Sequence, residues 1–155
     1  MAKKMALIAT KGTLDMAYPP FILGSTAAAL GWDVQIFFTF YGLQLLRKDL
    51  SDVKISPLGN PAMPMPIPMP VMVQMLPGME SMATMMMKQK MKSKGVASLE
   101  ELRDLCLEAD VKFVACQMTV DLFEFQKSDF IDNIEYGGAA TFMKFAGESD
   151  VCLFI

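Results

Sequence analysis

The sequence predicts an α/β protein: a single-domain, doubly wound, mostly parallel five-stranded sheet with helices on both faces. Three observations lead to this prediction. The chain has 155 residues, enough for one domain with a sizeable core. Short apolar runs of strand length alternate along it with stretches of helical pattern. A strand, a helix and a second strand in this order imply a right-handed crossover between parallel strands.

The N-terminal third supplies two strands and two helices. In order, they are expected as a strand over 5–10, a helix over 15–30, a strand over 34–39 and a short helix over 41–48. The strands are short and rich in residues that favour β-structure. Gly31 is a suitable stop for the first helix. Pro19 and Pro20 are best tolerated in a first turn, so the true start of this helix is expected near them.

Residues 57–92 are expected to form a Met/Pro-rich insertion in the domain, which spans 1–155. Seven prolines fall between Pro57 and Pro77, a density that excludes a regular helix or a central strand. They also interrupt the ~20 apolar residues that a transmembrane helix needs. The following stretch, 80–92, has a helical pattern and ends in lysines, which suit a helix C-terminus.

Methionine is concentrated in this insertion, because eleven of the sixteen methionines lie between Met63 and Met91. Thioether ligands suit Cu(I), which makes a copper site one interpretation. The segment lacks histidine and regular repeats, so we favour a flexible apolar surface that packs on a neighbouring subunit or a partner. Peripheral membrane contact through residues 61–91 is a further expectation from the same apolar character.

The C-terminal half begins with a well-marked helix. Ser98 and Glu101 form a capping box, and the apolar positions up to about Ala109 share one face. The elements expected after it are a strand over 111–115, a helical turn to about 125, an irregular or edge strand over 130–136, a turn at 137–138, a helix over 139–147 and a strand over 151–155. Cys116 therefore falls at the end of a strand.

Composition excludes several classes of function. The net charge of −3 and the pI near 4.9 come without a basic stripe, which argues against nucleic-acid binding. Histidine is absent, which removes Ser-His-Asp and Cys-His catalysis and the commonest zinc ligand. The apolar fraction of 53% and the mean hydropathy of +0.34 are high for a soluble monomer. They indicate surface that is buried in a homo-oligomer or against a membrane.

The three cysteines are far apart and form neither a zinc pattern nor a disulfide framework. Scattered thiols suit a reducing cytosol, and with no signal peptide recognised we expect a cytoplasmic location. Cys106 on the apolar face of a helix and Cys152 inside the last strand are expected in the core. Cys116 differs by position. Ligands bind outside the carboxyl ends of strands in such sheets, and the next helix N-terminus favours a thiolate there.

Candidate neighbours of this cysteine lie at other turns of the predicted sheet. Lys11 ends the first strand, and its ammonium could stabilise a thiolate if the two strands are close. Gly12 would allow a sharp turn or a close approach of the backbone to a ligand. Thr119 is expected as the N-cap of the following helix. The turns at Tyr41 and Gly137 are the remaining candidates to line the site. The ordinary alternatives are that Lys11 is a solvated surface lysine and that Thr119 has a purely structural role.

Four segments carry a resemblance to a known family. They are TKGT at 10–13, VKFVACQMT at 111–119, YGGAATF at 136–142 and LFI at 153–155. Together they resemble the DsrE/DsrF-like family, and more narrowly its DsrE-like or peroxiredoxin-like branch. The resemblance covers nearly the whole chain but not the Met/Pro-rich segment at 61–79. It implies a small α/β protein that forms homo-oligomers.

The resemblance also implies a function. Several members of that family are sulfur carriers or sulfurtransferases, in which a cysteine matching Cys116 takes up a persulfide or thiosulfonate group and passes it on. Partners are then TusA-type sulfur carriers or rhodanese-like proteins, and neither a metal nor an organic cofactor is needed. The alternative is a non-catalytic assembly or membrane-surface adaptor that uses the Met/Pro-rich segment, with Cys116 inert. Thiol reactivity in the folded protein distinguishes the two.

Overall fold

The computed structural model of the protein describes residues 1–55, 72 and 75–155. Its centre is a five-stranded sheet in the order β4-β3-β2-β1-β5, in which every pairing is parallel. The strands are β1 (Lys4–Ala9), β2 (Asp33–Phe38), β3 (Lys112–Cys116), β4 (Glu135–Gly137) and β5 (Val151–Phe154). The predicted α/β sheet is confirmed, and it is parallel throughout.

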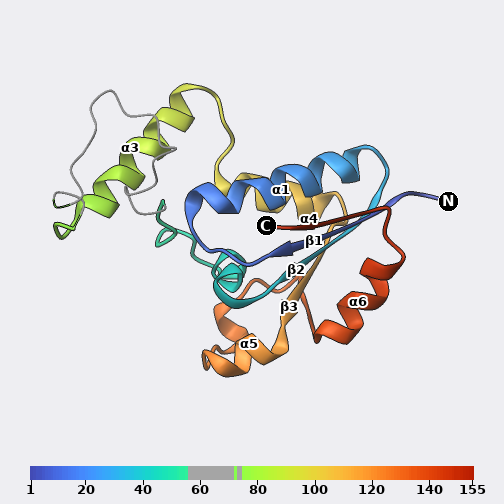
Figure 1. The fold of residues 1–155 in the computed structure, drawn as a ribbon. Coiled ribbons are helices and arrows are strands. Elements are labelled where there is room, and N and C mark those ends of the chain that lie inside the picture. The colour runs from blue at the N-terminus through green and yellow to red at the C-terminus, as the bar shows by residue number, and fades with distance from the viewer. Residues whose placement is uncertain (56–71, 73–74) are drawn as a thin grey trace.

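Helices lie on both faces of this sheet (Figure 1). The helices are α1 (Leu14–Ala29), α3 (Met79–Ser93), α4 (Leu99–Glu108), α5 (Gln117–Leu122) and α6 (Ala139–Gly147), with 3-10 segments η1 (Phe40–Leu46) and η2 (Lys127–Asp129). α1 and α4 pack side by side on one face, and α6 lies against the other (Figure 1). From β1 the chain adds β2, β3 and β4 on one side, and α6 then returns it to the other side for β5.

Each face of the sheet has its own apolar core. The larger core lies under α1 and α4, where the rings of Phe21, Phe38 and Phe113 lie with centroids 5.2–6.0 Å apart. The smaller core lies under α6, where Phe37 stacks on Phe142 at 4.8 Å. Alternation along β2 explains the division, because successive side chains of a strand point to opposite faces. Both faces are therefore apolar, as a parallel sheet covered on both sides requires.

The first helix begins earlier than predicted. α1 begins at Leu14, so Pro19 and Pro20 lie inside it and not in its first turn. Two contacts fix the earlier start: Leu14 is fully buried, and its N–H donates to the carbonyl of Lys54 at 2.7 Å. Burial of a leucine contributes about 1.5–3 kcal/mol, which helps to offset the backbone hydrogen bonds that the two prolines cannot donate.

Two other local expectations are corrected. The segment expected as a helix over 41–48 is the 3-10 segment η1, which begins one residue earlier and ends at Leu46. Gly137, expected in a turn, is the last residue of β4, and Gly138 follows directly as the N-cap of α6. The edge strand expected within 130–136 exists as β4 but begins only at Glu135.

Part of the Met/Pro-rich insertion is described. Residues 56–71 and 73–74 lie outside the described residues, so the expectations for them are not addressed. The helix expected over 80–92 is present as α3. Thr84 ties it to the domain, because it accepts a hydrogen bond from the Ile55 N–H at 3.0 Å and donates one to the Glu80 carbonyl. Across the described ranges, no helix is both long and apolar enough to cross a membrane.

Candidate functional site

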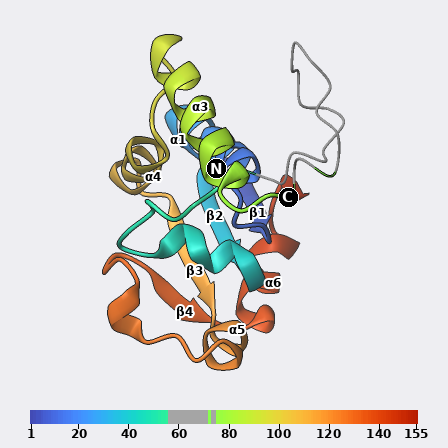
Figure 2. The same ribbon diagram turned by 90° about the vertical axis from the view of Figure 1, so that its left-hand side faces the viewer.

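Cys116 is the last residue of β3 and the N-cap of α5. Its side chain is only 4% exposed and packs in the smaller core with Phe142. Figure 2 looks towards the carboxyl ends of the strands, where η1 and α5 contact each other. The predicted place of the cysteine, at the carboxyl end of a strand, is confirmed. Because β2 and β4 are the neighbours of β3, the residues just after β2 and the end of β4 lie beside the cysteine.

Hydrogen-bond donors around the sulfur lower the pKa of the Cys116 thiol. Burial by itself raises this pKa, but the O–H and N–H of Thr119, the O–H of Thr39 and the N–H of Met118 together outweigh it. Each of these donors stabilises the thiolate more than the thiol. α5 has only six residues, so the individual donors account for the shift rather than a long helix dipole. A lowered pKa increases the fraction of Cys116 present as thiolate.

Thr119 has a different role from the predicted N-cap. The helix begins at Gln117, directly after the strand, so Cys116 is the N-cap and Thr119 is the third helical residue. Its side chain is fully buried, with its hydroxyl 3.2 Å from the hydroxyl of Thr39. The Phe40 N–H donates to the same Thr119 oxygen at 3.3 Å. Thr119 thus links the sulfur to the start of η1.

Thr39 is a site residue that sequence reasoning missed. It follows β2 just as Cys116 ends β3, and the register Phe38 to Ala115 makes the two positions neighbours. The sequence signal was a hydroxyl at a strand end. That signal becomes informative only once β2 and β3 are known to be adjacent.

Gly12 and Tyr41 contact each other through their backbones. A Cβ at Gly12 would collide with the Tyr41 carbonyl oxygen, and one at Gly42 would collide with that of Ala9. Both glycines therefore allow η1 to lie directly against the end of β1. The close backbone approach that was predicted at Gly12 is therefore to the Tyr41 carbonyl of η1. Gly137 lies beside the cysteine, because it pairs with Cys116 between β4 and β3.

Lys11 also lies at the carboxyl ends of the strands, but beside β5. Its ammonium is 6.0 Å from the centre of the Phe154 ring, which belongs to β5. β5 and β3 lie on opposite sides of β1 in the sheet. The ammonium of Lys11 therefore points towards β5. The groups that lower the pKa of the Cys116 thiol are hydroxyl and backbone donors. A role of Lys11 in lowering the thiol pKa stays a prediction.

The other two cysteines contrast with Cys116. Cys106 is buried as predicted and its thiol donates to the Phe21 carbonyl at 3.2 Å, and burial raises its pKa to about 12. Cys152 was expected in the core, but it is exposed. The physical reason is its place on β5, which is an edge strand that the helices cover incompletely. In the part of the chain that the structure describes, no cluster of three metal-binding side chains occurs.

An exposed apolar rim adjoins the buried sulfur. We define the aromatic rim as Phe40, Tyr41, Met118, Leu122 and Phe123, all of which are exposed. Phe123 stacks on Tyr41 at 6.1 Å and meets Phe40 edge-on at 6.3 Å. Phe40 has a φ of +48°, a left-handed conformation that costs a bulky residue roughly 1–3 kcal/mol. A strained residue thus helps to hold aromatic rings in solvent next to the segment that carries Cys116.

A doubly wound parallel sheet with a cysteine at the carboxyl end of one strand defines a class of small α/β proteins, with the thiol where such sheets bind their ligands. The chain belongs to the DsrE/DsrF/DrsH-like family, whose model matches residues 1–154. The resemblance predicted from the four sequence segments is therefore confirmed.

Two relatives match over almost their full length. The chain is 68% identical over 157 residues to sulfur carrier protein DsrE2 of Allochromatium vinosum, covering 99% of this chain and 98% of the relative. It is 34% identical to the uncharacterized protein YrkE of Bacillus subtilis, covering 99% and 97% of the two. The crystal structure of the ychN protein from E. coli matches with a TM-score of 0.55 over 100% of both chains, at 11% identity. That likeness shows the fold alone.

Proposed function

We propose that this protein is a sulfur carrier that holds a persulfide or thiosulfonate group on Cys116 and passes it to a partner thiol. The observation that carries the proposal is the buried Cys116 sulfur, whose pKa is lowered by donors from Thr39, Met118 and Thr119. The relative at 68% identity is itself named a sulfur carrier protein. A thiolate is the form that attacks sulfur, so the site is suited to this chemistry.

The transfer proceeds in two balanced exchanges. The Cys116 thiolate attacks the outer sulfur of a donor persulfide, a new S–S bond forms, and the donor's S–S bond breaks. The donor leaves as a thiolate and Cys116 carries the added sulfur with its proton. The thiolate of the acceptor then attacks that outer sulfur and releases the Cys116 thiolate. Neither exchange changes the overall oxidation state or needs a metal or an organic cofactor.

The aromatic rim is the surface on which we place the partner, a sulfur-carrier or rhodanese-like protein. The sulfur is too buried to meet a partner thiol unless the two surfaces dock closely. Exposed aromatic and methionine side chains are typical of the centres of protein interfaces. Asp121 and Glu124 lie in the same segment as the rim residues of α5 and are exposed. A partner with basic residues around its cysteine would complement them.

We further propose a cytoplasmic homo-oligomer, for which the scattered reduced thiols and the high apolar content are the support. In α3, the exposed methionines Met82, Met85 and Met86 offer apolar contact surface within the insertion. This surface favours the second candidate function, an assembly or membrane-surface adaptor, if Cys116 proves inert. Peripheral membrane contact through 61–91 remains a prediction.

The test is intact-mass analysis after incubation with polysulfide or tetrathionate. Because Cys152 is exposed, the Cys152→Ser variant is the starting protein, and we expect it to gain sulfur or thiosulfonate on one thiol. Adding Cys116→Ser should abolish this gain, whereas adding Cys106→Ser should leave it intact. The loaded protein should then lose the group to a second thiol. Uptake that persists without Cys116, or no uptake from any donor, would contradict the proposal and favour the adaptor function.

A further inference from the structure

The backbone of Phe40 is strained at a place where no helix end accounts for it. Three non-glycine residues that the structure describes have a positive φ: Phe40 at +48°, Glu124 at +56° and Asp110 at +61°. Asp110 and Glu124 directly follow the C-caps of α4 and α5, where a left-handed residue is an ordinary way to end a helix. Phe40 instead begins η1, directly after its N-cap Thr39. Its conformation therefore needs another explanation.

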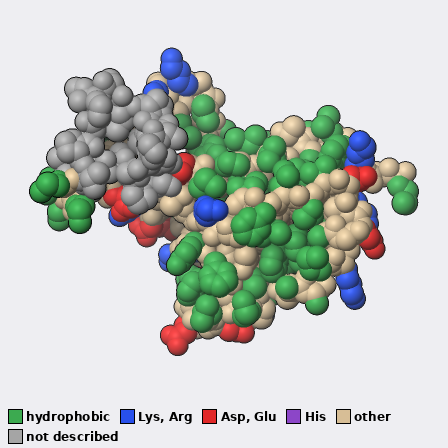
Figure 3. Space-filling view, in the orientation of Figure 1, with side chains coloured by type: hydrophobic (Ala, Val, Ile, Leu, Met, Phe, Trp, Pro, Cys, Tyr) green, Lys and Arg blue, Asp and Glu red, His purple; other side chains and the backbone are tan. Residues whose placement is uncertain are grey.

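The side chain of Phe40 does not account for the strain, because its ring lies at the surface. The ring is 44% exposed and meets Phe123 edge-on at 6.3 Å. Figure 3 shows the hydrophobic side chains that gather over α5 on this surface. The backbone, in contrast, is held on both sides of the peptide group between Thr39 and Phe40. Its carbonyl accepts from the Gly42 N–H at 3.0 Å, and its N–H donates to Thr119 Oγ1 at 3.3 Å.

The Phe40 N–H begins a chain of hydrogen bonds that ends at the Cys116 sulfur. Thr119 Oγ1, which accepts from this N–H, lies 3.2 Å from Thr39 Oγ1, and both hydroxyls stabilise the Cys116 thiolate. An N–H only donates and a thiolate only accepts, whereas a hydroxyl does both. The chain therefore has one direction, and its last hydroxyl donates to the sulfur. Successive bonds of such a chain polarise and strengthen one another.

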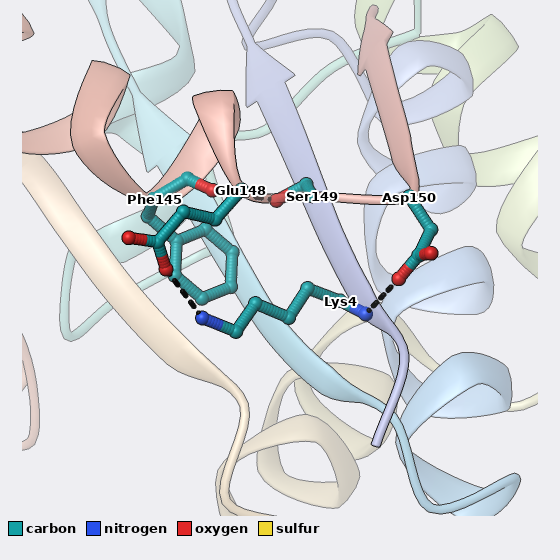
Figure 4. Close-up of polar contacts among 5 residues, drawn as sticks. All are labelled: Lys4, Phe145, Glu148, Ser149 and Asp150. Atoms are coloured by element: carbon teal, nitrogen blue, oxygen red, sulfur yellow. Dashed lines mark hydrogen bonds and ion pairs between the residues drawn. The ribbon is translucent and has the colours of Figure 1, made fainter. Parts of the chain in front are cut away.

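The direction of this chain matters because the donors around Cys116 are neutral. None of the groups that lower its pKa is charged. In the ranges that the structure describes, the ion pairs are Lys4–Glu148, at the amino ends of the strands (Figure 4), and Lys54–Glu80, at the start of α3. A neutral hydroxyl stabilises a thiolate only while its hydrogen points to the sulfur. When it turns away, it presents its lone pairs to the negative charge.

We propose that Phe40 is a positioning residue for Cys116: its left-handed backbone holds the N–H on Thr119 Oγ1 and so keeps the hydroxyls donating to the sulfur. Phe40 is not among the groups that act on the sulfur directly, so it acts through Thr119. A glycine would adopt the same φ freely, but it would remove a ring from the aromatic rim. The inference rests on the proposed function, because a positioned thiolate is of use only if Cys116 is the reacting thiol.

The test is the pH profile of iodoacetamide alkylation of Cys116 in Phe40→Gly and Phe40→Val, both in the Cys152→Ser background. Both substitutions remove the ring, but glycine adopts a positive φ freely, whereas a β-branched residue strongly disfavours it. Phe40→Gly should keep the midpoint of the profile. Phe40→Val should raise it by about 0.5–1 pH unit, which slows alkylation roughly 3–10-fold at neutral pH. The rates should converge at a pH above both midpoints.

Phe40→Ala keeps the test decisive if Phe40→Val does not fold, which rapid alkylation of the buried Cys106 would reveal. Alanine is less disfavoured at this φ than valine, so its midpoint should lie between those of the glycine and valine variants. Equal midpoints in the folded variants would overturn the proposal. A shift of the same size in Phe40→Gly would also overturn it, because the ring and not the backbone would then be responsible.

Asp110 is the matched control, because it has a similar φ and precedes β3, at the end of this strand opposite to Cys116. Asp110→Gly and Asp110→Ala should give the same Cys116 midpoint, and a difference as large as that at Phe40 would contradict a local role. The alkylation needs no sulfur donor. A shift in Phe40→Val without sulfur uptake by Cys116 would therefore refute the proposed function alone, and uptake without a shift would refute the positioning role alone.

Discussion

Cys106 and Cys116 are both almost fully buried, yet the pKa values of their thiols move in opposite directions. Burial raises the pKa of Cys106 to about 12 and outweighs the N–H and O–H donors of Ser25, while the thiol itself donates to the Phe21 carbonyl. Around Cys116 the groups are donors, and they lower the pKa in spite of burial. The comparison shows that neighbouring donors lower a thiol pKa only where they outweigh the desolvation of the sulfur, as they do at Cys116 and not at Cys106.

The largest expected effect is the difference in reactivity between these two thiols. Near neutral pH a thiol with a pKa of about 12 is ionised to about 1 part in 10⁵, and one below the ordinary value of 9 to more than about 1 part in 100. Iodoacetamide should therefore alkylate Cys116 at least ~1000-fold faster than Cys106, as measured by peptide mass mapping of the Cys152→Ser variant. Comparable rates in the folded protein would refute the assigned environments.

A smaller effect is expected when one donor is removed. Thr119→Val should raise the Cys116 pKa, because a hydrogen bond to a charged group contributes about 1.5–3 kcal/mol, or roughly 1–2 pKa units. Alkylation should slow by about tenfold at neutral pH and recover at a pH above both pKa values, where either protein is fully ionised. The measurement is the pH profile of the alkylation rate.

Thr119→Ser is the control for this substitution, because it keeps the hydroxyl and removes only a methyl group. Its profile should stay close to that of the wild type. If both substitutions slow the reaction equally at every pH, Thr119 acts by packing and not by donating to the sulfur.

The smallest effect is expected at the aromatic rim. Tyr41→Ser should leave alkylation of Cys116 by a small reagent unchanged, because the Tyr41 ring is 66% exposed and is not among the donors to the sulfur. It should slow sulfur transfer from Cys116 to a protein thiol a few-fold, since an exposed aromatic anchor contributes to docking. Met82→Ser removes apolar surface of α3 and serves as the control. Equal transfer rates in all three proteins would argue against docking at the rim.

The sequence predicts the fold and the position of Cys116 for a shared reason. Both depend on local patterns: apolar runs of strand length mark the sheet, and the run before Cys116 places that residue at a carboxyl end. Cys106 was also placed correctly, because the period of its helix marks an apolar face. These features need no knowledge of which strands are neighbours.

The features that were missed depend on strand order. Thr39 became a neighbour of Cys116 only because β2 pairs with β3, and Cys152 became exposed only because β5 is an edge. Lys11 was placed at the correct edge of the sheet, but its ammonium lies over β5. The N-cap was assigned to Thr119 instead of Cys116 because helix starts are uncertain by a few residues from sequence alone. Register and order are tertiary properties, so periodicity could not supply them.

The contact between Thr39 and Thr119 spans 80 residues of chain. The Thr39 donor to the Cys116 sulfur is therefore in place only when the first third of the protein meets the last third, a contact of high sequence separation that forms slowly. The donors from Met118 and Thr119 are local and need only the start of α5. The last rise in the alkylation rate of Cys116 during folding should therefore report the docking of η1 against α5, and can serve as a clock for that step.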